Sequence, residues 1–243
     1  IRPLRTVDWP AMPGNTAEKP ADSPARPSPP ADDLVTQITQ ALAGGPALAI
    51  IPTDPPARRQ LMLDVLDPRQ PLELQDVAFV VTTSGTSGVP KGALLTAAAV
   101  THSARPTHDA IGGPGQWLLA LPPTQIAGLQ VLVRSVLAGL APELMDPGAG
   151  FTAAGFAAAA DRLDSSARRY TALVPTQLDR LLADETGRAA LAGFDAVLLG
   201  GAAAAARLWA SAAELGVRVV GTYGMTETAG GCVYDGRPLP GVR

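Results

Sequence analysis

Cysteine and histidine are scarce in this sequence. Its 243 residues include one cysteine, Cys232, and two histidines, His102 and His108. One cysteine cannot form an internal disulfide, and the histidines have no cysteine partners at zinc-binding spacing. The sequence therefore excludes a disulfide framework and a zinc site of the usual kind. It fits a reducing compartment, so we expect a cytoplasmic protein.

Charge runs and long apolar runs are missing as well. The net charge is -3, and the 19 basic residues are scattered, whereas a nucleic-acid binder gathers them on one face. No apolar run approaches the about 20 residues that cross a bilayer, and the first residues lack the pattern of a signal peptide. We therefore expect neither nucleic-acid nor membrane partners.

Apolar residues, by contrast, are abundant. They make up 47% of the chain, enough for one large domain or two small ones with a real core. The stretch 10–30 differs, because it is crowded with Pro, Ala, Ser and charged residues. It has almost nothing large and apolar to bury and cannot offset its ordering entropy. We expect residues 1–31 to form a proline-rich N-terminal arm that is partly mobile.

From Asp32 onward, short apolar runs alternate with helical patterns. The first helix is expected to start at Asp32 or Asp33 and to end at Gly44. Strands are expected at 47–51, 77–82, 117–121, 170–174, 196–199 and 217–220. The alanine-rich stretches 153–160 and 202–213 read as helices. This alternation predicts an α/β fold of largely parallel sheets with helices on both faces, in which ligands bind at the carboxyl ends of strands.

A run of hydroxyl residues and glycines, closed by a lysine, follows the strand expected at 77–82. A flexible surface loop is the simple interpretation, but glycine exposes backbone N–H groups to an anion, hydroxyls add donors and lysine adds charge. Pro90 and Gly92 flank Lys91, which excludes a Walker A loop. The pattern predicts a different phosphate-binding loop. Its candidate contacts are Thr83, Ser84, Gly85, Thr86, Ser87, Gly88 and Lys91.

Three segments carry a resemblance to a known family. Residues 83–92 (TSGTSGVPKG) resemble the signature loop of the acyl-CoA synthetase, luciferase and peptide-synthetase adenylation superfamily. Residues 221–227 (GTYGMTE) are similar to its Tyr-Gly-x-Thr-Glu motif, and residues 200–202 (GGA) resemble its turn beside the adenine. The resemblance implies the large-domain fold of adenylating enzymes, present here in part.

The resemblance also implies roles for individual residues. Tyr223 would stack on adenine, Thr226 would bond the α-phosphate, and Glu227 would hold Mg²⁺; an aromatic face suits a purine and a carboxylate suits magnesium. Lys91, Thr226 and Glu227 are the candidate catalytic residues. Further nucleotide contacts are implied at Gly200, Gly201, Ala202, Thr222, Gly224 and Met225. ATP, Mg²⁺ and, as co-substrate, CoA are the implied cofactors.

Other segments indicate which carboxylic acid the substrate is. Residues 173–178 (LVPTQL) are similar to the o-succinylbenzoate-CoA ligase family of menaquinone biosynthesis, and residues 112–115, 126–135 and 230–236 resemble its actinobacterial branch. Candidate substrate contacts are Gln125, Gly128, Pro175, Thr176 and Gln177. For the last three, a plain helix start with proline in the first turn is the alternative, although a helix N-terminus also suits a carboxylate.

Two residues depart from what the patterns lead us to expect. Gln125 stands where the family has histidine, and glutamine cannot carry a positive charge. Arg134, Arg168 and Arg169 are the candidates for binding a second carboxylate of the acid. Pro106 lies within the helix expected after Thr96 and should kink or end it.

The superfamily continues beyond the point where this sequence stops. We therefore expect residues 32–243 to be a truncated adenylation domain without the small C-terminal domain, lacking full activity by itself. The implied protein is an AMP-forming acid-CoA ligase that activates o-succinylbenzoate with ATP and transfers the acyl group to CoA. The alternatives are another aryl or acyl acid-CoA ligase, a carrier-protein-loading adenylation domain, and a catalytically silent nucleotide-binding fragment. A second copy, as a homodimer, is a candidate partner.

Overall fold

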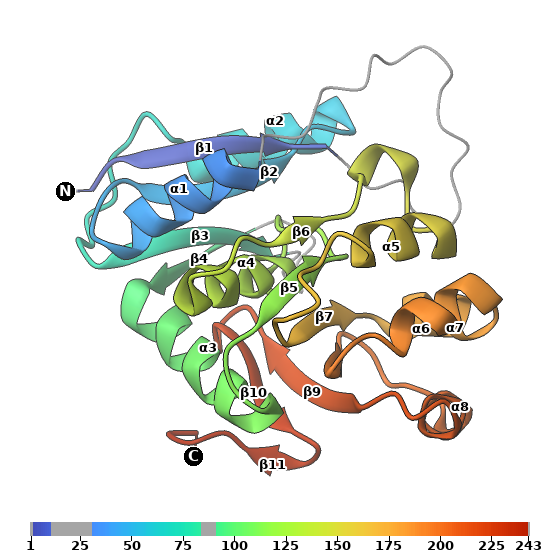
Figure 1. Cartoon of the computed structure of the whole chain (residues 1–243). Helices are drawn as coiled ribbons and strands as arrows, with labels where there is room; N and C mark the ends of the chain where they lie inside the picture. Colours follow the sequence, from blue (N-terminus) through green and yellow to red (C-terminus); the bar gives the residue numbers. More distant parts are fainter. Residues whose placement is uncertain (1, 11–30, 84–90, 243) are drawn as a thin grey trace.

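The computed structural model describes residues 2–10, 31–83 and 91–242, which form two sheets with helices between and outside them (Figure 1). The first sheet has the order β1-β2-β3-β4. Its strands are β1 (Leu4–Trp9), β2 (Ala47–Pro52), β3 (Val77–Thr83) and β4 (Lys91–Thr96). β1, β2 and β3 pair in parallel, whereas β4 runs antiparallel to β3.

The second sheet has the order β11-β10-β9-β8-β7-β5-β6. Its parallel part comprises β5 (Gln116–Leu119), β6 (Glu143–Leu144), β7 (Arg169–Leu173), β8 (Ala196–Leu199) and β9 (Val219–Met225). The antiparallel strands β10 (Gly230–Tyr234) and β11 (Arg237–Pro238) complete one edge.

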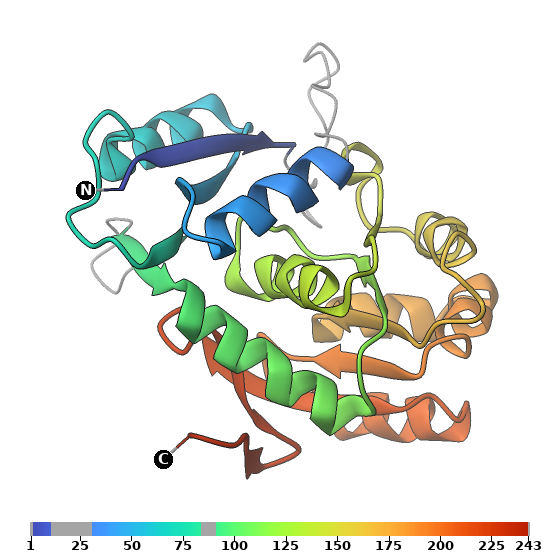
Figure 2. The ribbon, with the colours of Figure 1, turned by 60° about the vertical axis from the view of Figure 1, so that its left-hand side comes forward.

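Three helices lie between the sheets: α1 (Ala31–Leu42), α3 (Ala97–Ile111) and α4 (Ile126–Ala138). The outer helices are α2 (Pro56–Leu66) on the first sheet and, on the second, α5 (Ala153–Ala160), α6 (Pro175–Leu182), α7 (Glu185–Leu191) and α8 (Ala206–Glu214). The short 3-10 helix η1 (Pro147–Ala149) precedes α5. Figure 2 shows α1, α3 and α4 stacked beside one another.

The alternation of side chains along the strands builds this layering. In β5, Trp117 and Leu119 join the central core, whereas Leu118 packs with the outer helices. Successive side chains of a strand point to opposite faces, so a strand buried on both faces reads as a continuous apolar run. Helix α4 is buried from Gly128 through Ser135, as expected for a helix enclosed on all sides.

The predicted fold class is confirmed: α/β with largely parallel sheets and helices on both faces. Each predicted strand has a counterpart in the structure. β1 was not predicted, and it lies within residues 1–31, which we had assigned to an arm; its pairing with β2 makes residues 4–9 part of the sheet. Residues 11–30 lie outside the described residues, and the division into an arm and a domain stays a proposal.

Helix α3 does not end at Pro106, contrary to one of the two expectations. It begins at the N-cap Thr96, whose side chain accepts a hydrogen bond from the Ala99 amide at 3.0 Å, and it runs through Pro106 to Ile111. The ribbon of α3 is one unbroken helix in Figure 2. Because proline has no backbone N–H, Pro106 cannot donate the helical hydrogen bond that the carbonyl of His102 would otherwise accept. His102 is exposed, so water can donate a hydrogen bond to that carbonyl. Among the described residues, no helix is long and apolar enough to cross a membrane.

Candidate active site

A cleft of about 430 Å³ opens at the carboxyl ends of the strands of the second sheet. The ends of β7 and β8, the hairpin β9–β10 and the start of α4 form three of its sides. Thr82 and Thr83, at the end of β3, close the fourth together with α2. The site therefore lies where the two sheets meet, at the strand ends where α/β folds bind ligands.

Several nucleotide candidates line this cleft together, although they are far apart in sequence. They are Thr83, Gly200, Gly201, Thr222, Gly224 and Thr226. Lys91, Ala202, Tyr223, Met225 and Glu227 do not line it, but all are exposed and lie beside residues that do. The candidates Ser84, Gly85, Thr86, Ser87 and Gly88 lie outside the described residues.

The turn after β8 brings backbone close to the neighbouring strand. The Thr222 hydroxyl donates to the carbonyl of Leu199 at 3.2 Å. A Cβ atom at Gly200 would collide with that hydroxyl. Glycine is therefore required here by the close approach of β8 and β9, which leaves the backbone of this turn open to the cleft.

A tight turn at residues 226–229 joins β9 to β10 and presents Thr226 and Glu227. The Ala229 amide donates to the Thr226 carbonyl at 2.9 Å. The Thr228 hydroxyl accepts from the Met225 amide at 2.9 Å. Ala229 adopts a left-handed backbone, with φ 55°, which is uncommon for a residue with a side chain.

The candidate substrate contacts fall into two groups: residues that line the cleft and residues that pack against other parts of the protein. Gln125, the exposed N-cap residue of α4, lines the cleft. Gly128, Pro175, Thr176 and Gln177 do not line it. A Cβ atom at Gly128 would collide with the carbonyl of Pro122, so this glycine lets α4 approach the preceding loop.

The loop-to-helix segment at 174–177 is held together by Gln177. Its amide oxygen accepts from the backbone N–H of Val174 at 3.1 Å, and its amide nitrogen donates to the Ala120 carbonyl at 2.9 Å. Pro175 occupies the first turn of α6, the position predicted for a plain helix start. The Gln177 amide thus fastens the end of β7 to the end of β5.

Arg134 is a buried cation beside the cleft. It is 3% exposed and lines the cleft. One guanidinium nitrogen donates to the Tyr234 hydroxyl at 3.2 Å, and the guanidinium carbon lies 5.2 Å from the centre of the Trp117 ring. Its Nε is buried without a hydrogen-bond partner among the described residues.

Burial lowers the pKa of the Arg134 guanidinium, and Tyr234 acts in the opposite direction. A buried charge without a carboxylate partner is costly. Arg134 is therefore suited to an anionic ligand that enters the cleft. The other two arginine candidates do not line the cleft: Arg168 donates to the Gly112 carbonyl and Arg169 to the Asp164 carbonyl. They belong to the amino end of β7, opposite the ligand-binding edge.

Gln130 and Tyr234 also line the cleft, and the sequence analysis did not select them. Gln130 and Arg134 are one helical turn apart on α4, within a largely apolar run. Long polar side chains at i and i+4 on a buried helix share one face. That spacing from Arg134 was the signal that could have identified Gln130.

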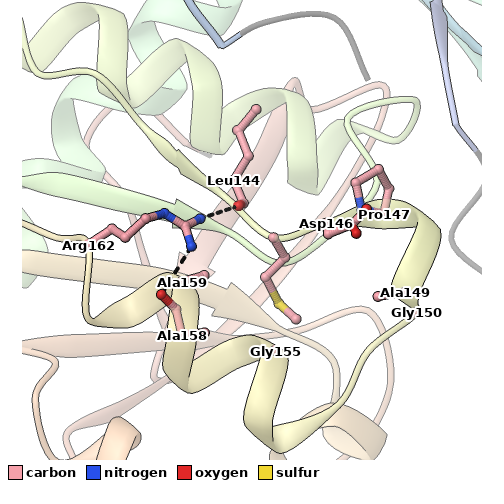
Figure 3. A pocket seen from close by; sticks show the side chains of 10 residues that line it. Leu144, Asp146, Pro147, Ala149, Gly150, Gly155, Ala158, Ala159 and Arg162 are labelled. Atoms are coloured by element: carbon pink, nitrogen blue, oxygen red, sulfur yellow. Dashed lines mark hydrogen bonds between the residues drawn. The ribbon is translucent and has the colours of Figure 1, made fainter. Parts of the chain in front are cut away.

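A second hollow, of about 330 Å³, lies between β6, η1 and α5 (Figure 3). Its arginine, Arg162, donates to Glu143 at 2.8 Å, to the Leu144 carbonyl at 2.8 Å and to the Ala158 carbonyl at 3.0 Å. Asp146 accepts from the Gly148 amide at 2.9 Å. Because its charged groups already have protein partners, this hollow is a poor candidate for a ligand site.

Comparison with known proteins gives a consistent result. The model of the AMP-binding enzyme family matches residues 14–242. The chain is 52% identical over 212 residues to the probable 2-succinylbenzoate-CoA ligase of Mycobacterium tuberculosis, covering 86% of this chain and 54% of the relative. It is 33% identical over 185 residues to the 2-succinylbenzoate-CoA ligase of Enterococcus faecalis, covering 74% and 36%.

Among solved structures, wild-type E. coli MenE with a bound phenylether-linked analogue of OSB-AMS has a TM-score of 0.59 and 25% identity. That match covers 80% of this chain and 49% of the other. MenE of Bacillus subtilis with the acyl-adenylate OSB-AMP has the same TM-score, 0.59, at 24% identity, covering 85% and 47%. The chain thus spans only part of the length of the relatives it matches, with 54% of the first and 36% of the second.

Proposed function

Because the chain belongs to the AMP-binding enzyme family, we propose that it forms the nucleotide- and acid-binding part of an AMP-forming 2-succinylbenzoate-CoA ligase. The similarity to proteins of that name supports the substrate, at 52% identity in one case. The complete reaction belongs to a polypeptide of the relatives' full length, since this chain spans about half of it. ATP, 2-succinylbenzoate and CoA are the proposed substrates.

One observation carries the proposal: phosphate-binding candidates share one cleft with a buried arginine that has no carboxylate partner among the described residues. Thr83, Gly200 and Thr226 line it at the ends of strands, and Arg134 lines it from α4. A succinylbenzoate has two carboxylates, of which one reacts and the other stays anionic. Arg134 is the buried cation that can bind the second one, because a charge-assisted hydrogen bond offsets its desolvation.

In the first half-reaction, an oxygen of the reacting carboxylate attacks the α-phosphorus, a new P–O bond forms and pyrophosphate leaves. In the second, the CoA thiol attacks the acyl carbonyl and AMP leaves. The protein has mainly to position the reactants and to neutralise phosphate charge. Lys91 and Thr226 are the groups we assign to the phosphates. Tyr223, 62% exposed beside the cleft, is free to stack on adenine.

Glu227 would hold the Mg²⁺ that accompanies ATP. Within the described residues, no group of three metal-binding side chains occurs. This fits magnesium bound with a nucleotide, because Mg²⁺ takes one or two carboxylates and fills its other positions with phosphate oxygens and water. Glu227 is exposed on the turn next to Thr226. When bound, the ion would neutralise phosphate charge.

The test compares acids with one and two carboxylates. In a polypeptide of the relatives' full length that contains this chain, acid-dependent pyrophosphate exchange is measured with 2-succinylbenzoate and with benzoate. We expect kcat/KM to favour 2-succinylbenzoate by about tenfold or more, the value of one charge-assisted hydrogen bond. Arg134→Lys should reduce kcat/KM for 2-succinylbenzoate and leave the benzoate value nearly unchanged. The benzoate rate thereby controls for folding.

Two results would contradict the proposal at different levels. A wild type that prefers benzoate would reject the substrate and leave a ligase for another aryl acid. A folded wild type without exchange for any acid tested would reject adenylation and favour a catalytically silent nucleotide-binding protein.

A further inference from the structure

Gln130 connects α4 to the turn that carries Thr226 and Glu227. It is 1% exposed. Its amide nitrogen donates to the Ala229 carbonyl at 2.6 Å and to the Val100 carbonyl at 3.1 Å. Because an amide nitrogen carries two hydrogens, both are used and the orientation of the amide is determined. One bond ties α4 to α3, and the other ties α4 to the turn.

The turn has a particular need for this bond. Ala229 is 2% exposed and has a left-handed backbone, with φ 55°. A buried carbonyl without a donor is costly, and a strained residue keeps its conformation only when its surroundings hold it. The Ala229 amide bonds the Thr226 carbonyl at 2.9 Å. A displacement of Ala229 would therefore displace Thr226 as well.

Gln130 is also a residue of the cleft. Gln130 lines it one helical turn from Arg134. Its Oε1 is buried without a hydrogen-bond partner among the described residues. Among the described residues, the amide is thus held through its nitrogen, between α3 and the 226–229 turn.

We propose that Gln130 is a positioning residue for adenylation, which holds the 226–229 turn through the Ala229 carbonyl. This rests on the proposed function, because it assigns the turn to the nucleotide. Gln130 acts through Thr226 and Glu227 and does not itself touch the reacting atoms.

The test separates positioning from general packing. In a polypeptide of the relatives' full length, KM for ATP, KM for the acid and kcat are measured by pyrophosphate exchange for Gln130→Met and Gln130→Glu. Both replacements keep about the same volume, Met has no donor for the Ala229 carbonyl, and Glu carries at most one hydrogen for the two carbonyls that the amide serves. Ser135→Ala is the matched control, because the Ser135 hydroxyl is buried on the same helix and bonds the Val131 carbonyl at 3.0 Å, away from the turn.

We expect both Gln130 variants to raise KM for ATP or lower kcat by about tenfold, the effect of losing one buried hydrogen bond. KM for the acid should change by less than about twofold, and Ser135→Ala should resemble the wild type. Thermal unfolding checks that each variant folds, and Gln130→Glu serves if Gln130→Met does not.

The proposal is overturned if the Gln130 variants keep wild-type kinetics. It is also overturned if both KM values and the melting temperature of the Gln130 variants change together, as a general packing defect would produce. A wild type that adenylates a different acid would reject the proposed substrate only, and the same comparison could then be made with that acid.

Discussion

At the scale of the residue, the site depends on side chains whose partners come from distant parts of the chain. The Thr107 and Tyr234 hydroxyls lie 2.8 Å apart, and Arg134 donates to Tyr234 at 3.2 Å. Trp117 lies under the guanidinium at 5.2 Å. These contacts hold Arg134 in one orientation while its Nε stays without a partner among the described residues. A buried arginine held in this way is preorganised for an anion.

The first prediction concerns Gln125. We expect Gln125→His to raise kcat/KM for 2-succinylbenzoate in the full-length polypeptide. An imidazolium adds a charge-assisted contact worth about tenfold when it is desolvated. Gln125 is exposed and Arg134 already supplies a cation, so the gain should stay below that value.

The pH dependence of the Gln125 variant supplies the control. A histidine near its ordinary pKa of about 6.5 is charged at pH 6 and neutral at pH 8. The gain should therefore be larger at pH 6, and benzoate should show little of it. An equal gain at both pH values, or for both acids, would mean that charge is not the cause.

The second prediction concerns His108, a residue of α3 that packs near Trp117. Burial, helped by the nearby charge of Arg134, lowers the pKa of His108 to about 4, while Asp109 acts in the opposite direction. In the unfolded chain the pKa is about 6.5. The neutral ring therefore contributes its full stability above pH 6.5, and that stability is lost as the pH falls towards 4.

Urea unfolding of this chain between pH 7.5 and pH 4.5 measures the His108 effect. The free energy of unfolding should fall by less than about 1.4 kcal/mol per pH unit from this group. His108→Phe should reduce the slope, whereas His102→Gln, at an exposed site of the same helix, should retain it. The same slope in wild type and His108→Phe would assign the pH dependence to other groups.

At the scale of the element, α4 is the element that organises the site. Its buried middle packs against α1, α3 and β5. Three of its residues line the cleft: the N-cap residue Gln125 and the interior residues Gln130 and Arg134. A helix buried on all sides can move little, so the positions of these side chains follow from the packing of the core.

The third prediction concerns Gly128 in the first turn of α4. A Cβ atom there would collide with the carbonyls of Pro122 and Leu121. We expect Gly128→Ala to lower the free energy of unfolding by about 1–3 kcal/mol through overpacking. Urea unfolding checks the value. Gly193→Ala is the control, because its Cβ atom would meet nothing closer than 3.3 Å.

A different outcome would restore the role that the sequence analysis assigned to Gly128. If Gly128→Ala kept wild-type stability and raised KM for the acid, the residue would contact the substrate rather than the preceding loop.

At the scale of the whole molecule, the arrangement of the sheets determines what can be bound. The cleft joins the end of β3 in the first sheet to the ends of β7 and β8 in the second. The three helices between the sheets set their separation. The nucleotide side and the acid side therefore meet only when both sheets and α4 are in place.

The fourth prediction is that ATP with Mg²⁺ binds this chain weakly, with a Kd of about 0.1–1 mM, which corresponds to a binding free energy of about 4–5.5 kcal/mol. The chain spans 54% of its relative in Mycobacterium tuberculosis, and Tyr223 is 62% exposed beside the cleft. Titration calorimetry checks the value. Glu227→Gln should remove the part of the affinity that requires Mg²⁺. A folded sample without nucleotide binding at millimolar concentration would count against the assignment.

The sequence by itself determined the type of most elements and the chemistry of their loops. Apolar runs such as 196–199 predicted strands because a strand buried on both faces needs apolar side chains at every position. The patterns at 83–92 and 221–227 predicted a phosphate loop and a nucleotide motif, and Thr83 and Thr226 do line one cleft. These features are local, since periodicity, turn residues and hydroxyl runs act within a few residues of the chain.

Only the tertiary structure decided which residues meet. β1 is a strand because β2 offers it a parallel edge, and that pairing leaves no local signal. Arg134, Arg168 and Arg169 were equal candidates in the sequence, and packing brought Arg134 alone of the three into the cleft. Gln177 has its amide occupied by Val174 and Ala120, a result of the distance between β5 and β7. Such contacts depend on how layers pack, and packing sums many weak interactions between residues remote in sequence.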